Sequence, residues 1–182
     1  MLSGDKLKEC LQASEQSLND VAAALVRPGL DQEDACRALR NWQRGLYKPQ
    51  PTVQDLDNLA RALGVEREAL SIWTACHRYA PMAPRKVRLV TELIKGRAAQ
   101  DALDVLKFAN KRAAVMVNKV LRSAIANADE DEADLERLYV REARVDEGGI
   151  RAGTRRWRPK DRGRAHSWQR LASHIHVSVD VD

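Results

Sequence analysis

The stretch that most restricts how this chain can fold is "GGIRAGTRRWRPKDRGRAHSW", residues 148–168. It has four glycines, two tryptophans and a single acid, Asp161, among many cations, and no apolar stripe wide enough to build a core. The flanking segments "RLYVREARV" and "HIHVSVDV" both have the pattern of β-strands. Two good strands are therefore joined by a segment that is poorly able to pack against its own protein.

We expect a long hairpin at about 145–175 that takes its shape from a polynucleotide. A two-stranded ribbon alone is marginally stable in water, and eight Lys and Arg within 151–170 repel one another. Phosphates reverse that balance, because neutralising them releases counterions and arginine offers a planar fork. Tryptophan rings can stack on unpaired bases. Arms of about 15 residues would reach about 50 Å at about 3.3 Å per residue. The alternative is a solvated, disordered basic loop.

The charge of the chain is unevenly distributed. Residues 1–74 contain 9 Lys and Arg against 11 Asp and Glu, whereas residues 75–182 contain 22 against 15. With a formal net charge of +5 and a pI near 9.3, this indicates a polyanionic partner. The cysteines have unrelated spacings, and the sequence shows no apolar leader and no run long enough for a membrane span. We expect a soluble protein of the reducing cytosol.

Residues 1–74 are predicted to form a small all-α domain. Apolar residues recur at helical spacing within 5–27, and the "RPGL" segment breaks that pattern. Asp31 is placed to cap a helix through "QEDACRALRNWQR". Thr52 and Gly64 bracket the next helix, and "EREALSIW" is expected to be a last short one.

The order "NWQRGLYKP" and then "LDNLARALGV" resembles the helix-turn-helix domain of the Xre/lambda-repressor type over residues 15–73. A recognition helix inserts its N-terminal residues into the major groove. Here that turn reads Asp31-Gln32-Glu33-Asp34, and its carboxylates would repel phosphates. We therefore favour contacts with protein or an RNA surface for this module. The alternative function for the whole chain is a helix-turn-helix DNA-binding regulator with a basic nucleic-acid-binding tail.

Residues 75–182 are predicted to form an α+β domain. One helix starts at Pro84, with Val87, Val90, Leu93 and Ile94 as its apolar face. "AAQDALDVLKF" and "NKRAAVMVNKVLRSAIANADED" are two further helices, and "DEDEAD" is expected to be an acidic loop. At the C-terminal end, apolar residues alternate with His174, His176, Ser178 and Asp180, which predicts a strand with these four on its solvent side. Helices followed by strands imply a small antiparallel sheet.

Several segments of this second region carry a family resemblance: "PRKVRLVTELIKG", "ALDVLKFANKRAAVMVNKVLRSAIANA", "LYVREARVDEG", "RPKDRGRAHSW" and "SHIHVSV". Over residues 78–182 the chain closely resembles the large-subunit ribosomal protein L twenty-two family. The resemblance implies three helices packed on a three-stranded sheet and a long protruding β-hairpin that runs through ribosomal RNA to the wall of the nascent-peptide exit tunnel. The chain departs from the family in its leading extension, in Gly148-Gly149, and in additional residues around "RAGTRR".

The expected function is therefore a structural constituent of the large ribosomal subunit that binds large-subunit (23S-type) rRNA and neighbouring ribosomal proteins near the tunnel exit. We expect no enzyme, no small-molecule substrate and no cofactor. His174-x-His176 lacks a third metal ligand, and "DEDEAD" lacks the spacing of a calcium loop. The positions expected to contact rRNA are Arg85, Lys86, Arg88, Lys111, Arg112, Lys119, Arg151, Arg155, Arg156, Trp157, Arg158, Lys160, Arg162, Arg164, His166, Trp168 and Arg170.

Overall fold

The structure, a computed structural model, describes residues 1–14 and 17–181. Glu15 and Gln16, where the helix-turn-helix resemblance begins, and Asp182 lie outside the described residues. The chain divides into two compact units, Met1–Ile72 and Trp73–Asp182, each with its own buried apolar cluster. We call them the N-terminal and the C-terminal unit.

The N-terminal unit is helical. Its elements are α1 (Gly4–Ala13), α2 (Leu18–Ala23), α3 (Gln32–Gln43), α4 (Val53–Leu63) and α5 (Arg67–Leu70). Trp42 at the end of α3 is fully buried, and its indole Nε1 donates a hydrogen bond to the Pro49 carbonyl at 2.7 Å. A Cβ at Gly4 would collide with the Trp42 carbonyl oxygen, so glycine allows α1 to approach α3 closely. Trp42 is the largest fully buried side chain of this unit, and it lies where α1 packs against α3.

Three helices of this unit are capped at their N-termini by side chains of the chain itself. The hydroxyls of Ser3 and Ser17 accept hydrogen bonds from backbone N–H groups at the starts of α1 and α2. Thr52 and Asp55 form a complete capping box on α4, as two reciprocal bonds of 3.3 and 2.8 Å. Asp31 precedes α3 as the sequence predicts, but its side chain makes no capping hydrogen bond.

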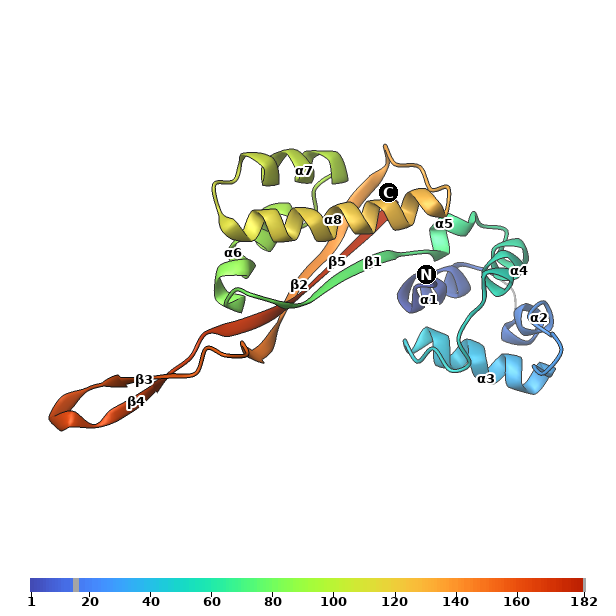
Figure 1. Ribbon diagram of the computed structural model, residues 1–182. Coiled ribbons are helices and arrows are strands. Elements are labelled where there is room, and N and C mark those ends of the chain that lie inside the picture. Colours follow the sequence, from blue (N-terminus) through green and yellow to red (C-terminus); the bar gives the residue numbers. More distant parts are fainter. Residues whose placement is uncertain (15–16, 182) are drawn as a thin grey trace. The chain divides into compact units, whose positions relative to one another are not determined.

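The C-terminal unit is built on an antiparallel sheet with strand order β1-β5-β2 among the described residues. The strands are β1 (Trp73–Ala80), β2 (Leu138–Ile150) and β5 (Leu171–Val181). Figure 1 shows α6 (Pro84–Ile94), α7 (Ala99–Phe108) and α8 (Arg112–Glu130) together on one side of this sheet. The predicted α+β class, with three helices on a small antiparallel sheet and a helical region before it, is confirmed.

The core of this unit lies between helices and sheet. An apolar stripe of α8 is buried there, and so is one side of β5. The residues buried there include Ala114, Val117, Leu121, Ala124, Ala128, Ile175, Val177 and Val179. Periodic burial of this kind is the main source of stability for a small α+β domain, because each helix has an apolar stripe that needs a partner.

Three local expectations were wrong. The last short helix, α5, ends at Leu70 and not at Trp73, which starts β1 and pairs with Val179. Leu93 is 40% exposed, and Thr91 is buried in its place with its hydroxyl bonded to the Arg88 carbonyl. Asp180 is buried rather than solvated, because β5 is the central strand and Arg141 on β2 pairs with its carboxylate at 3.1 Å.

The acidic segment also differs from the expectation of a loop. Asp129 and Glu130 are the last residues of α8, and Asp131 follows them as its C-cap. The Asp131 carboxylate accepts a hydrogen bond of 2.8 Å from the Trp73 indole Nε1, which ties the end of α8 to the start of β1. At least one acid of this segment therefore has a structural role inside the unit.

Candidate nucleic-acid interface

The basic segment 151–170, which we call the ribbon, continues β2 and β5 beyond the sheet (Figure 1). It contains β3 (Arg156–Pro159), a short 3-10 turn at Asp161–Gly163, and β4 (Ala165–Trp168). Every residue of the ribbon is exposed except Thr154 and Trp168, which are half-buried. The ribbon is therefore held by backbone pairing and by contacts among its own side chains, with no buried core.

The strand register places the two tryptophans on opposite faces of the ribbon. Arg156 pairs with Trp168 and Arg158 with His166, whereas Trp157 pairs with Ser167 between them. Since directly opposed residues share a face and neighbours alternate, Trp168 lies on the face of Arg156, Arg158 and His166. Trp157 lies on the other face. Each side of the ribbon thus presents an aromatic ring among cations.

Arginine guanidinium groups lie close to both rings. Arg158 and Arg170 are 4.8 and 5.3 Å from the Trp168 ring centre, and Arg155 is 5.9 Å from that of Trp157. Cation–π contacts at exposed sites contribute about 0.5–1 kcal/mol each. They orient the cations without neutralising them, which leaves the full charge available to phosphates.

The root of the ribbon contains a compact turn within "RAGTRR". The Thr154 hydroxyl donates to the Arg151 carbonyl at 2.6 Å, and the Arg170 N–H donates to Thr154 Oγ1 at 3.3 Å. Arg151 N–H donates to the Arg170 carbonyl at 2.9 Å. The Cβ that Gly148 lacks would press against the backbone of β5 at 3.2 Å. These contacts join the ribbon to the sheet although the β-ladder is interrupted here.

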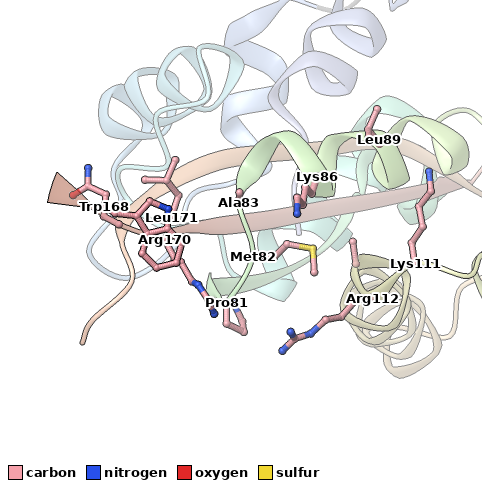
Figure 2. A pocket seen from close by; sticks show the side chains of 12 residues that line it. Pro81, Met82, Ala83, Lys86, Leu89, Lys111, Arg112, Trp168, Arg170 and Leu171 are labelled. Atoms are coloured by element: carbon pink, nitrogen blue, oxygen red, sulfur yellow. The ribbon is translucent and has the colours of Figure 1, made fainter. Parts of the chain in front are cut away.

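Beside this root lies a cleft of about 750 Å³, lined by Pro81, Met82, Ala83, Lys86, Leu89, Lys111, Arg112, Ala113, Trp168, Gln169, Arg170 and Leu171. Figure 2 shows Met82 between the α6 turn that carries Lys86 and the end of α8 that carries Arg112. Trp168 and Arg170 approach from the ribbon, and Leu171 is the first residue of β5. The cleft thus brings together five of the predicted contact residues from three separate parts of the sequence.

Two helices begin at this cleft without any acidic residue. Ala83 precedes α6 and Lys111 precedes α8, neither makes a side-chain cap, and neither helix has an acid in its first turn. Helix N-termini carry partial positive charge. Cations stand at both of these ends: Arg85 and Lys86 in the first turn of α6, and Arg112 as the first residue of α8. Their positive charge is unfavourable next to that of the helix N-termini. A bound anion would relieve both helix ends.

The other predicted contact residues have different surroundings. Arg85 and Lys119 are exposed and do not line the cleft. The Arg88 guanidinium donates to the Val145 carbonyl at 3.3 Å, so part of its hydrogen-bonding capacity holds α6 on β2. Sequence reasoning missed the apolar lining of the cleft, Pro81, Met82 and Leu89, because single apolar residues in a loop or on a helix carry no recognisable pattern.

His174 and His176 lie on β5, away from any ligand set. The Tyr79 backbone N–H donates to His174 Nδ1 at 3.1 Å, and His176 Nε2 is 3.7 Å from the Asp146 carboxylate. Within residues 1–14 and 17–181, no group of three or more His, Cys, Asp or Glu is arranged to hold a metal ion. In the same described ranges, no helix is both long and apolar enough to span a membrane.

Comparison with known proteins identifies the C-terminal unit. The family model described as Ribosomal protein L22p/L17e matches residues 75–180, more than half of the chain. The chain belongs to this ribosomal protein family. One relative is the large ribosomal subunit protein uL22 of Sorangium cellulosum (strain So ce56), 39% identical over 102 residues that cover 56% of this chain and 90% of the relative. The L22p/L17e match confirms the resemblance drawn from the sequence, and it leaves the N-terminal unit outside.

Membership in this family sets the function at a coarse level. The chain is a structural constituent of the large ribosomal subunit and is not an enzyme. Its partners are ribosomal RNA and other ribosomal proteins. Which residues meet which partner is a separate question, and the ribbon and the cleft are the surfaces with the chemistry for RNA.

Proposed function

We propose that the chain binds large-subunit rRNA through the ribbon, the cleft and the exposed cations of α6 and α8, and that the ribbon contributes to the wall of the peptide exit tunnel. The single observation that carries this proposal is the ribbon itself, which exposes eight cations and places one tryptophan on each face. A surface of this kind suits RNA packed around both faces, because stacking and phosphate contacts become available on each side.

The reach of the ribbon supports the tunnel-wall assignment. β3 and β4 project well beyond the three helices of the same unit (Figure 1). Beyond the Ile150–Leu171 pair, the arm that leads to the turn at Asp161–Gly163 spans residues 151–160, which at about 3.3 Å per residue is up to about 33 Å from the sheet. An element of this length and charge crosses a layer of RNA rather than resting on its surface, and the neighbouring ribosomal proteins then lie around the globular body.

DNA binding by the N-terminal unit is less favoured. α3 exposes Glu33 and Asp34 in its first turn, and Asp34 forms an ion pair of 2.9 Å with Arg37. Carboxylates at that end of a recognition helix would face DNA phosphates. We propose instead that this unit contacts other ribosomal proteins near the tunnel exit.

The test compares two variants of the full chain, each lacking six cations. In the ribbon variant Arg151, Arg155, Arg156, Arg158, Arg162 and Arg164 become Gln; in the control variant Lys8, Arg37, Arg40, Arg44, Lys48 and Arg61 of the N-terminal unit become Gln. Binding to purified large-subunit rRNA is measured over a range of salt concentrations. We expect the ribbon variant to lose about 10³-fold in affinity for the rRNA. The slope of the logarithm of the binding constant against the logarithm of the salt concentration should become shallower by about four.

The control variant should keep both the affinity and the salt slope of the unchanged chain. Equal losses in the two variants would mean that the RNA senses only net charge, and the ribbon would then have no special role. Footprinting of the rRNA tests the position of the ribbon. The unchanged chain should protect nucleotides of the tunnel region, and the ribbon variant should not.

A further inference from the structure

The cleft has features that phosphate binding alone does not require. Four cations line it, Lys86, Lys111, Arg112 and Arg170, and no carboxylate does. Among the residues that the structure describes, none of these four cations belongs to an ion pair. A surface that only lay along an RNA backbone would need these charges and little else.

The rest of the lining is apolar and aromatic. Pro81, Met82, Leu89 and Leu171 line the cleft together with Trp168. Leu89 is 55% exposed and Leu171 is 39% exposed, so both keep apolar surface in contact with water. Exposed apolar side chains grouped in a hollow indicate a binding site. Methionine and tryptophan in addition offer a polarisable surface to a flat ring.

The volume of the cleft and its two kinds of lining, cationic and apolar, indicate what it binds. A volume of about 750 Å³ is within the range of small-ligand sites, about 300–1,000 Å³, and is too small for a duplex. A nucleotide has one anionic end and one flat, mostly apolar end, and these match the two kinds of lining. Resting on the proposed function, we propose that the cleft holds a single unstacked nucleotide of the bound rRNA, with its phosphate on the cations and its base against Met82 and Trp168.

The location of the cleft is consistent with such a nucleotide. Trp168 and Arg170 belong to the root of the ribbon, so RNA that follows the ribbon toward the sheet arrives at the cleft. Proteins commonly read single nucleotides that have left the stack by holding the base on an aromatic ring. The Arg158 and Arg170 guanidinium groups at the Trp168 ring, 4.8 and 5.3 Å from its centre, orient that ring at the cleft entrance.

The experiment uses the full chain with labelled methionine methyl groups and tryptophan indoles, followed by NMR. The chain has three methionines and four tryptophans, so Met82 and Trp168 can be read against the other residues as internal references. Adenosine 5′-monophosphate should shift the Met82 methyl and the Trp168 indole and leave Met1 and Trp42 unchanged. Ribose 5-phosphate should bind at least about tenfold more weakly, because it lacks a base to stack.

Two double variants test the charges. Lys86→Gln with Arg112→Gln should weaken binding of adenosine 5′-monophosphate about tenfold. Lys95→Gln with Arg122→Gln removes the lysine at the C-cap of α6 and one arginine of α8, both outside the cleft, and should change this affinity by less than about twofold. Both control positions are exposed, and both variants should keep the Met116 and Trp73 signals of a folded C-terminal unit.

Three results of these titrations would overturn the proposal. One is no shift of Met82 and Trp168 with the nucleotide, and another is equal affinity for ribose 5-phosphate, which would make the cleft a plain anion site. The third is an equal loss in the two double variants. Ultraviolet cross-linking to large-subunit rRNA, followed by nuclease digestion, should give a mononucleotide adduct within residues 81–89 or 168–171; adducts confined to the rest of the ribbon would also contradict it.

The two proposals fail separately. If the ribbon variant loses rRNA binding while Met82 never responds to the nucleotide, rRNA binding by the ribbon stands and the nucleotide site is wrong. If the ribbon variant keeps full rRNA affinity while the nucleotide responses are as expected, the cleft is a nucleotide site and the role given to the ribbon is wrong.

Discussion

Three helices of the N-terminal unit and two helices of the C-terminal unit begin in different ways. In the N-terminal unit, serine and threonine side chains cap α1, α2 and α4, and each of these helices has an acid in its first turn. In the C-terminal unit, α6 and α8 have neither a side-chain cap nor a first-turn acid, and cations stand at both starts. The first arrangement satisfies the helix ends within the chain, whereas the second leaves them positively charged.

This difference separates a unit that is complete by itself from one that is completed by a partner. A cap and an acid each stabilise a helix end by up to about 1 kcal/mol, so their absence from α6 and α8 costs stability in the free protein. An anion at these ends supplies the missing charge. The same logic applies to the ribbon, which has mutually repelling cations and no core.

The strongest test of the independence of the N-terminal unit is Trp42→Ala. Trp42 is fully buried and loses its hydrogen bond to Pro49 in this variant. The free energy of unfolding of the N-terminal unit should fall by about 3–5 kcal/mol. Hydrogen exchange of peptides from residues 1–72 and 73–181 measures the two units separately.

In the same variant, affinity for large-subunit rRNA should stay within about twofold, because Trp42 belongs to a different compact unit from the ribbon and the cleft. A large loss of rRNA affinity would show that the N-terminal unit takes part in RNA binding, and the contrast between the units would then be wrong.

A smaller effect is expected for the cap of α4. Thr52→Ala removes the hydroxyl that accepts from the Asp55 N–H and from the Arg27 guanidinium, the latter at 2.9 Å. The N-terminal unit should lose about 1–2 kcal/mol, measured by thermal unfolding of the full chain and assigned by hydrogen exchange. Thr52→Ser keeps the hydroxyl and should restore most of this stability; if it does not, the cap is not the cause.

Much of the C-terminal unit could be predicted from local pattern. The apolar stripe of α8 and the alternation of β5 are regular enough to fix the buried side of each element. β1 was missed because Trp73–Ala80 contains no Val, Ile or Leu, and it becomes a strand through pairing with β5. The burial of Asp180 also has no local signal, since it depends on Arg141 from the neighbouring strand.

The candidate site also has one part that a local sequence pattern reveals and one part that depends on residues distant in the chain. The ribbon is visible in the sequence because its cations, glycines and tryptophans are contiguous, and its register then assigns the tryptophans to opposite faces. The cleft is not visible, because Met82, Arg112 and Trp168 are distant in the chain and meet only through the packing of α6, α8 and β5. Lys86 and Arg112 were chosen for their charge, and only the structure shows that they share one hollow.

The substitution with the smallest expected change in stability is the sharpest test of the contrast between the units. It gives α6 the kind of N-terminus that α1, α2 and α4 have. Ala83→Asp places a carboxylate at the N-cap of α6, where the backbone is extended as a cap requires. The C-terminal unit should become more stable by about 0.5–1 kcal/mol. Its affinity for rRNA should fall by about three- to tenfold, because the carboxylate repels the phosphate that we expect in the cleft.

Ala83→Ser is the matched control, since it caps the same helix without adding charge. It should raise stability to a similar extent and leave rRNA affinity within about twofold. Thermal unfolding and rRNA titration of the two variants separate the effects. If Ala83→Asp raised stability with no loss of affinity, the start of α6 would not face an anion, and its missing cap would be only a local weakness of the fold.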